Sequence, residues 1–244
     1  MRRALIAFSL LAIFLGGCAN APTENDISGI WINQGAIDAA AKGQPLLETL
    51  RGHSNLEWDI DSRRDKATSN SGAEVGGGRL LKRKPGVWTV DYNGYGSDEL
   101  RFNGKQLIQL AKSYEPEQVF ARPKESAVKD PRWAGTFRQA LNSAYMGGSW
   151  KVVDGTGNTV RFYSDGRVEG LPGADHYELC LAGDCSSDMP TGYDNLLLRN
   201  QDTGRGFFFT RNGKWLEIFG ITDINPELKG SGKPSTRQWL LEKQ

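Results

Sequence analysis

Hydrophobic and polar residues alternate along most of the chain that follows residue 27. Leu56, Trp58 and Ile60 alternate with acidic residues, which is the pattern of a strand with one buried face. The pairs Asn103-Gly104 and Asn212-Gly213 each lie between two such segments, and Asn-Gly readily adopts the positive φ angles of a type I′ hairpin turn. The pattern predicts a mainly β protein. The predicted strands are residues 56–60, 79–84, 87–92, 99–102, 105–110, 118–121, 158–164, 167–170, 177–181, 195–199, 207–210, 214–221 and 238–241.

Helical segments are predicted at two places. Residues 35–42 have high helix propensity and precede Gly43, a residue that commonly ends a helix, and residues 45–50 can form one or two further turns. Asp130 can cap a helix and Pro131 suits its first position, and five apolar residues then recur at helical spacing. These five are expected to cover the base of a barrel or to fill the seam between two domains. They are Trp133, Phe137, Ala140, Leu141 and Ala144.

Three polar segments interrupt the alternation. Residues 62–78 end in three consecutive glycines, and we expect a weak strand and a mobile loop there. Residues 123–132 are polar and bounded by prolines, which indicates a domain boundary. Residues 222–235 are punctuated by proline and glycine and are expected to form a loop.

The two halves of the chain share three landmarks in the same order, which indicates an internal duplication. Each unit of roughly 95 residues carries seven or eight short strands, and such a unit must close on itself or leave long unpaired edges. The matched landmarks are Gly29-Ile30-Trp31 with Gly148-Ser149-Trp150 at an offset of 119, residues 102–107 with 211–216 at an offset of 109, and residues 119–121 with 238–240 at an offset of 119.

The Gly-x-Trp motif at the first strand of each antiparallel unit resembles the lipocalin, or calycin, barrel. The resemblance implies two tandem small antiparallel barrels in which the tryptophan plugs the closed end. Short helices are expected at the start of the first domain and between the domains. We assign residues 27–123 to domain 1, 124–144 to a linker with a helix, and 145–244 to domain 2. The alternative is a single two-sheet sandwich without a true repeat.

The N-terminus has the features of a secretory signal. Arg2 and Arg3 precede an apolar stretch at residues 4–15 that is too short to span a bilayer. The ending Leu15-Gly16-Gly17-Cys18 resembles the lipobox of bacterial lipoproteins. The resemblance implies that residues 1–17 are removed and that the Cys18 sulfur carries a diacylglyceryl group. The alternative is an ordinary cleaved signal that leaves Cys18 as a free thiol.

The segment after Cys18 suggests where the protein is located. Residues 18–26 are polar and lack an apolar period, so we interpret them as a tether between lipid and fold. Residue 19 is alanine, whereas an aspartate there usually retains Gram-negative lipoproteins in the inner membrane. The resemblance therefore implies a lipid-anchored envelope protein, on the periplasmic face of the outer membrane if the source is Gram-negative.

Cys180 and Cys185 flank a four-residue loop. In an oxidising envelope compartment the natural interpretation is a disulfide that pins this loop. Two alternatives stay open. The cysteines could form a redox pair, or they could bind a metal with His176 and Asp184, although that site would need a further dedicated ligand.

The balance of charge argues against a nucleic-acid partner. Removal of residues 1–17 from a chain with 30 basic and 29 acidic residues takes away two arginines and no acid, which leaves a net charge of −1. A near-neutral balance gives no long-range attraction to nucleic acid or anionic lipid, so membrane attachment is expected through acyl chains. The basic stretch from Arg79 to Lys84 is interpreted as a solvated edge that resists aggregation.

Motifs for catalysis are missing from the sequence. The chain has two histidines, no Gly-x-Ser-x-Gly motif, and no glycine-rich loop followed by Gly-Lys-Ser/Thr. We therefore expect no enzyme activity, no catalytic residue, no cofactor and no metal site. An uncharacterised hydrolase is the third and least favoured function.

The favoured function is a non-catalytic binding or assembly role. An envelope protein would be recognised through loops or barrel faces, and Tyr92 and Tyr95 in an aromatic, glycine-containing loop are the candidate contacts. The alternative interpretation of these tyrosines is a buried strand end. The alternative function is a lipocalin-like carrier of a small apolar ligand, which requires an open barrel cavity.

Overall fold

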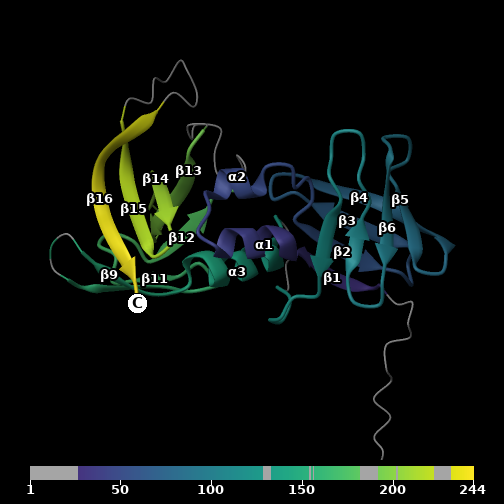
Figure 1. Ribbon diagram of the computed structural model, residues 1–244, viewed down its shortest axis with the longest axis horizontal. Helices are drawn as coiled ribbons and strands as arrows, with labels where there is room; N and C mark the ends of the chain where they lie inside the picture. Colours follow the sequence, from purple (N-terminus) through teal and green to yellow (C-terminus); the bar gives the residue numbers. More distant parts are fainter. Residues whose placement is uncertain are drawn as a thin grey trace, which may run out of the picture.

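The structure is a computed structural model that describes residues 27–128, 133–153, 155, 157–181, 192–201, 203–222 and 232–244. Two eight-stranded antiparallel units stand at either end of the molecule, and short helices lie between them (Figure 1). The first unit, barrel 1, is closed, and the second, barrel 2, is nearly closed. The predicted fold class is therefore confirmed. Within the described ranges, no helix is both long and apolar enough to cross a bilayer.

Barrel 1 is a meander in which each strand pairs with the next strand along the chain. Strand β8 also pairs with β1, with Ala121 opposite Ile32, so the barrel has no unpaired edge. The strands are β1 (Gly29–Asn33), β2 (Glu57–Asp61), β3 (Lys66–Asn70), β4 (Val75–Lys84), β5 (Val87–Asp91), β6 (Ser97–Phe102), β7 (Leu107–Gln109) and β8 (Gln118–Ala121).

Barrel 2 repeats this order, because its first strand, β9, pairs with its last, β16. Strands β11 and β12 lie at the two edges of the sheet and are joined by a single bridge between Arg167 and His176. The barrel is therefore nearly closed, with a seam between β11 and β12. The strands are β9 (Gly148–Val152), β10 (Thr159–Phe162), β11 (Val168–Glu169), β12 (His176–Leu179), β13 (Asp194–Asn200), β14 (Thr203–Asn212), β15 (Trp215–Thr222) and β16 (Lys233–Lys243).

The strand registers of the two barrels match at the predicted hairpin. Phe102 pairs with Leu107 between β6 and β7, and Arg211 pairs with Leu216 between β14 and β15, which preserves the offset of 109. Neither hairpin has the type I′ turn expected for Asn-Gly, because Gly104 and Gly213 have positive φ angles but Asn103 and Asn212 do not. The Asn103 side chain instead accepts hydrogen bonds from the Lys105 and Gln106 N–H groups, at 3.0 and 2.8 Å, in a longer loop.

The third landmark of the repeat was aligned two residues too early. Ile32 pairs with Ala121 in barrel 1, and its counterpart Lys151 pairs with Glu242 in barrel 2. Residues 119–121 therefore correspond to 240–242 and not to 238–240. A shift of two residues keeps the same faces inward, so the alternation alone could not reveal it.

The two Gly-x-Trp tryptophans occupy equivalent buried positions. Trp31 Nε1–H donates to the Ile27 carbonyl and Trp150 Nε1–H donates to the Met146 carbonyl, each at 2.8 Å. Both indole rings are buried, and each ties the start of its barrel to the segment four residues earlier. Both tryptophans therefore lie in the core on the first strand of their barrel.

A cation lies over each of these tryptophans, and a glycine with a left-handed backbone lies two residues before each. Arg122 lies 3.9 Å from the centroid of the Trp31 ring, and Lys243 lies 5.5 Å from that of Trp150. Gly29 and Gly148 have φ angles of +104° and +108°, and a Cβ on Gly29 would lie 2.7 Å from Arg122 Nη1. Only glycine adopts this backbone conformation without strain.

The polar segment at residues 62–78 contains β3 and the start of β4, so the predicted strand is present, but most of the predicted loop is a second paired strand. Strands β3 and β4 pair along their length, with glycines in β4. A Cβ on Gly78 would lie 2.5 Å from Val90 Cγ1, and a Cβ on Gly76 would lie 2.9 Å from Ser69 Oγ. These glycines make room for close packing and do not mark a loop.

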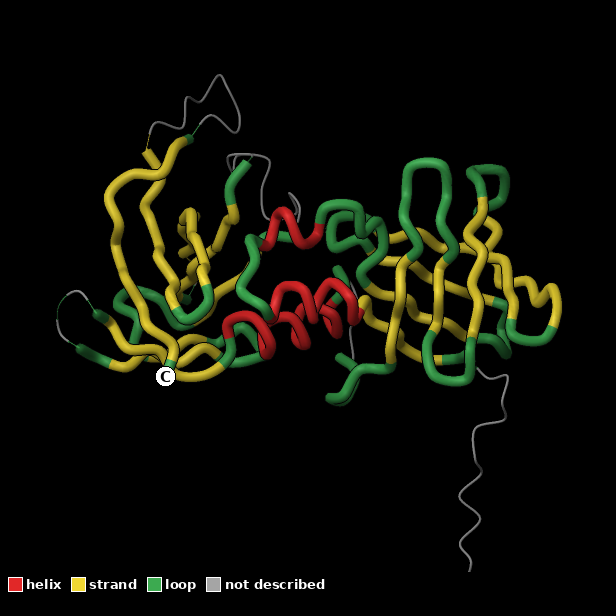
Figure 2. The backbone as a smooth tube through the Cα atoms, in the orientation of Figure 1, coloured by secondary structure: helices red, strands yellow, loops and turns green. Residues whose placement is uncertain are grey.

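The helices form a layer between the barrels (Figure 2). They are α1 (Gln34–Ala41), α2 (Leu46–Leu50), α3 (Gly135–Leu141) and the π-helical turn η1 (Asn142–Met146). Ile37, Leu46 and Leu50 belong to one continuous apolar cluster with Phe137 and the core of barrel 2. The predicted seam-filling role is thus correct for most of the apolar residues of α3, but Trp133 is 55% exposed because it precedes the helix.

Two buried carboxylates hold this layer to the barrels. Asp194 on β13 accepts the N–H groups of Leu46 and Leu47, at 2.7 and 2.6 Å, at the start of α2. Glu57 on β2 accepts the Phe137 N–H at 2.8 Å near the start of α3. Helix α3 begins at Gly135, so it does not start at Pro131 as predicted. Residues 129–132, which include the predicted cap Asp130, lie outside the described ranges.

Both carboxylates have raised pKa values because they are removed from water. Burial raises the pKa of Glu57 to about 7, against the opposing effect of the α3 amide groups. Burial likewise raises the pKa of Asp194, although the α2 amide groups lower it in part. The alternation of polar and apolar residues in β2 predicts that Glu57 faces solvent. Its side chain does point away from the barrel interior, but helix α3 covers it.

Candidate functional site

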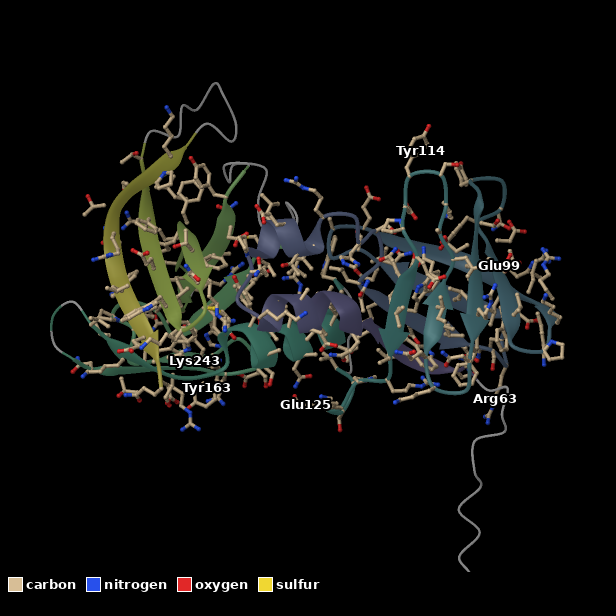
Figure 3. The ribbon with its side chains drawn as sticks, viewed as in Figure 1. Arg63, Glu99, Tyr114, Glu125, Tyr163 and Lys243 are labelled. Atoms are coloured by element: carbon tan, nitrogen blue, oxygen red, sulfur yellow. The ribbon has the colours of Figure 1, made fainter. Side chains whose placement is uncertain are left out.

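Three alternate hairpins of barrel 1 end on the same side of the barrel, because its strands alternate in direction. They connect β3 to β4, β5 to β6, and β7 to β8, and each carries an exposed hydrophobic side chain. Val75 is 52% exposed, Tyr95 94% and Tyr114 98%. We call this surface, residues 70–75, 91–98 and 109–118, the rim of barrel 1. Tyr114 marks it in Figure 3.

The β5–β6 loop holds Tyr95 outward by its backbone conformation. Asn93, Gly94 and Gly96 have φ angles of 54°, 96° and 111°. The Tyr92 N–H donates to the Gly96 carbonyl at 3.1 Å, and the Asn93 N–H donates to Asp91 Oδ1 at 3.0 Å. The Asn-Gly-x-Gly sequence supplies residues that tolerate left-handed backbone, so the chain reverses tightly and Tyr95 lies at its tip.

The β7–β8 connection displays Tyr114 in a similar way. Lys112 and Glu115 form an isolated bridge, with N–H to O distances of 2.9 and 3.3 Å. Ser113 and Tyr114 are the two residues of the turn between them, so the tyrosine side chain has no neighbouring strand to cover it. Pro116, which cannot donate to a sheet ladder, follows directly.

Tyr92 is separated from Tyr95 by the same loop. Its hydroxyl donates to Asp98 Oδ2 at 2.7 Å and lies 3.4 Å from Ser69 Oγ. Burial, with Asp98 adding to it, raises the pKa of Tyr92. The two sequence candidates therefore divide: Tyr95 is available as a contact, whereas Tyr92 is a half-buried strand end that anchors the loop.

A buried hydrogen-bonded network lies beneath the rim. Asp98, 3% exposed, also pairs with Lys112 Nζ at 2.6 Å and accepts from Gln109 Nε2 at 3.1 Å. Gln109 Oε1 in turn accepts from Asn55 Nδ2 at 2.9 Å and from Trp58 Nε1 at 3.3 Å. A buried charge is tolerated only when it is paired in this way, and the pairing draws the β6, β7 and β2 sides of the mouth together.

The network continues to the strands that close the barrel. Asn33 Nδ2 donates to Gln118 Oε1 at 3.1 Å, and Gln118 Nε2 donates to Ser54 Oγ at 2.8 Å. Asn33 Oδ1 also accepts the Ala36 N–H at 3.1 Å and so caps helix α1. Below this polar layer, large buried side chains fill the lumen. They are Trp31, Trp58, Ile60, Leu80, Trp88, Val90, Leu100, Leu107 and Phe120.

A cleft of about 450 Å³ lies beside the seam of barrel 2. Leu141 and Leu179 line it, together with the basic side chains Arg138 and Arg199 and the acidic Glu178. Arg138 is held in place, because its guanidinium donates to the carbonyl groups of Trp133 and Leu179 at 2.9 and 3.0 Å. This volume is within the range of small-molecule sites.

The other sequence candidates lie largely outside the described ranges. Cys18 and Cys185 fall there, so lipidation and the disulfide stay predictions. Cys180 is buried just after β12. His176 is exposed and its Nδ1 lies 2.8 Å from Asp175 Oδ1. Among the residues that the structure describes, no three His, Cys, Asp or Glu side chains gather as a metal site.

Sequence reasoning missed two rim residues, Val75 and Tyr114. Val75 was missed because residues 62–78 were interpreted as a weak strand and a mobile loop and not as two paired strands. Tyr114 had a usable signal, since it is a lone aromatic residue in a polar stretch that ends at Pro116. A single exposed tyrosine at such a position indicates a hairpin tip.

The rim carries an excess of acid as well as its hydrophobic side chains. Its acidic residues are Glu74, Asp91, Asp98, Glu115 and Glu117, and its one basic residue is Lys112. Comparison with protein-family models, curated proteins and solved structures finds no match. The functional argument therefore starts from the chemistry of this surface.

Proposed function

We propose that this chain is a non-catalytic envelope protein, anchored by a lipid on Cys18, that recognises a protein partner through the rim of barrel 1. The observation that carries the proposal is the exposure of Tyr95 and Tyr114 on neighbouring hairpins. Tyrosine offers a large, amphipathic contact at low entropic cost. The acidic side chains around it favour a partner surface with complementary positive charge.

The interior of barrel 1 supports a protein partner over a small ligand. The lumen is filled by apolar side chains, and the network around Asp98 and Gln109 occupies the mouth. A ligand that entered there would have to break paired buried groups, each of which costs about 1–3 kcal/mol when left unsatisfied. Recognition by the outer loops leaves this network intact.

Site-specific photo-crosslinking in cells tests the proposal. A photoreactive phenylalanine derivative is placed at position 95 or at position 114 of the full chain. Position 99 serves as the control, because Glu99 is exposed on the outer wall of the same barrel (Figure 3). The expected result is the same discrete protein adduct from positions 95 and 114 and none from position 99.

Two outcomes would overturn the proposed rim. One is an absence of adducts from positions 95 and 114 although the protein reaches the envelope. The other is an equal yield from position 99, which would show that adducts report general crowding. Labelling with a radioactive fatty acid tests the anchor separately, and a Cys18→Ser variant should lose the label.

A second candidate is a lipocalin-like carrier of a small ligand, favoured by the cleft beside the seam of barrel 2. Its lining combines apolar side chains with two arginines that are both paired with Glu178, which suits a small amphiphile with a polar head. Native mass spectrometry of the chain from residue 19, before and after mild organic extraction, would reveal such a ligand. A discrete extractable mass that is lost in an Arg199→Glu variant supports the carrier, and a clean unliganded mass supports the protein partner.

A further inference from the structure

The end of barrel 1 opposite the rim is strongly basic. We call it the base and define it by the turns and strand ends at residues 61–66, 82–86, 101–106 and 121–123. It contains nine basic and two acidic residues, a net charge of +7, whereas the rim has one basic and five acidic residues. Its basic residues are Arg63, Arg64, Lys66, Lys82, Arg83, Lys84, Arg101, Lys105 and Arg122, all of them exposed.

The order of the strands brings these basic residues together, although the amino-acid composition of the whole chain is nearly neutral. Strands β2, β4, β6 and β8 all run toward the base, so the basic residues at their C-terminal ends or just after them meet there although they are far apart in sequence. Barrel 1 is therefore polarised between Arg63 and Tyr114, which lie at its opposite ends in Figure 3. A near-neutral chain gives no net long-range attraction, but a clustered face acts locally over about one Debye length, 8 Å.

Several of these cations are available to a partner. Among the described residues, the side chains of Arg63, Lys84 and Lys105 make no hydrogen bond or ion pair. They lie on three different turns of the base. Arg64 is paired with Asp61 at 3.5 Å, and that pair is largely exposed to solvent.

The N-terminal segment enters the fold at this same end. Ser28 Oγ accepts the Ser62 N–H at 3.1 Å, so the chain that leads back to Cys18 reaches barrel 1 beside the basic turn at residues 62–65. Eight residues separate Cys18 from Ile27, and even a fully extended segment of that length spans only roughly 30 Å. A lipid on Cys18 therefore keeps the base close to the bilayer surface.

We propose that the base of barrel 1 binds the headgroups of anionic phospholipids on the membrane that holds the lipid anchor. One set of acyl chains and a basic face together hold a protein on a membrane more firmly than either does alone. In this orientation the rim points away from the membrane, toward the partners that it is proposed to bind. The inference rests on the proposed anchoring at Cys18.

Vesicle binding of the non-lipidated chain tests the base separately from the anchor. The chain begins at residue 19, which keeps every described residue, and its co-sedimentation is measured with phosphatidylcholine vesicles that contain about one-third phosphatidylglycerol. The test variant is Arg63→Gln/Lys84→Gln/Lys105→Gln. The control variant, Lys42→Gln/Lys151→Gln/Lys233→Gln, removes the same charge from exposed positions elsewhere in the chain.

We expect the unmodified chain to bind these vesicles, and to bind less as salt is added. Three neutralisations at the base should weaken binding by roughly 100-fold, whereas the control variant should stay within about 2-fold of the unmodified chain. Equal losses in both variants, or equal binding to vesicles of phosphatidylcholine alone, would overturn the inference. Neither outcome affects the rim, whose crosslinks at positions 95 and 114 test the proposed function independently.

Discussion

Replacing Glu57 by glutamine removes a charge that the fold buries between barrel 1 and helix α3. Glutamine has nearly the same shape and keeps an oxygen that can accept the Phe137 N–H, which donates to Glu57 Oε2 at 2.8 Å. Packing and the principal hydrogen bond are therefore preserved. The variant differs from the native chain mainly in being neutral at every pH.

The size and sign of the effect follow from the pKa of Glu57. Burial raises this pKa from 4.5 to about 7, and a tenfold difference in proton affinity corresponds to about 1.4 kcal/mol. The folded state therefore binds the proton more tightly than the unfolded state does. Glu57 contributes up to about 3 kcal/mol of stability that is fully present below about pH 4.5 and is lost as the pH rises through about 7.

Urea unfolding of the native chain and the Glu57→Gln variant, at several values between about pH 4.5 and pH 8, measures this effect. Relative to the variant, the native chain should lose up to about 3 kcal/mol over that range. Glu99→Gln, on the exposed wall of β6, is the control and should show no such trend. A flat difference would refute the reasoning, and a native chain that gains stability with pH would show that the α3 amide groups outweigh burial.

Five further variants test the fold and the rim. Gly29→Ala and Gly148→Ala should each destabilise by about 1–3 kcal/mol because the backbone there is left-handed, and Gly29→Ala should cost more because its Cβ would meet an arginine. Tyr92→Phe should cost about 1–3 kcal/mol by removing a donor to a buried carboxylate, whereas Tyr95→Ala should stay within about 0.5 kcal/mol. Asp194→Ala should cost about 1 kcal/mol because it uncaps α2.

Thermal and urea unfolding measure these changes, and each has a result that would contradict it. If the two glycine variants were as stable as the native chain, the backbone at the starts of β1 and β9 would have relaxed without strain. Equal costs for the Tyr92 and Tyr95 variants would show that both side chains are structural and would remove the basis of the rim. If Asp194→Ala left the free energy of unfolding unchanged, the apolar face of α2 alone would account for its attachment to barrel 2.

The alternation of polar and apolar residues predicted most strands, because each barrel wall has one face toward solvent and one face toward the core. It failed at residues 62–78, where glycines 76 and 78 relieve close contacts within paired strands and local composition resembles a loop. Trp133 was misplaced because helical spacing does not reveal where a helix begins. The register of β16 was missed because a slip of two residues preserves the pattern of faces.

The site was less predictable than the fold because it depends on which turns meet. The tyrosine loop could be found from Asn93-Gly94, since these residues require a tight reversal. The cover that α3 places on Glu57 and the gathering of cations at the base both join residues distant in sequence. Neither is encoded in a local pattern, so only the topology reveals them.

The position of α1 and α2 has a consequence for how the chain can be divided. These helices lie between β1 and β2 in sequence, yet their apolar side chains complete the core of barrel 2. A fragment that begins at residue 145 would lack Leu46 and Leu50 and would leave that core open to water. The repeated unit is therefore smaller than the unit that can fold by itself. The second half of the chain completes its core only after the first half has supplied this helical insert.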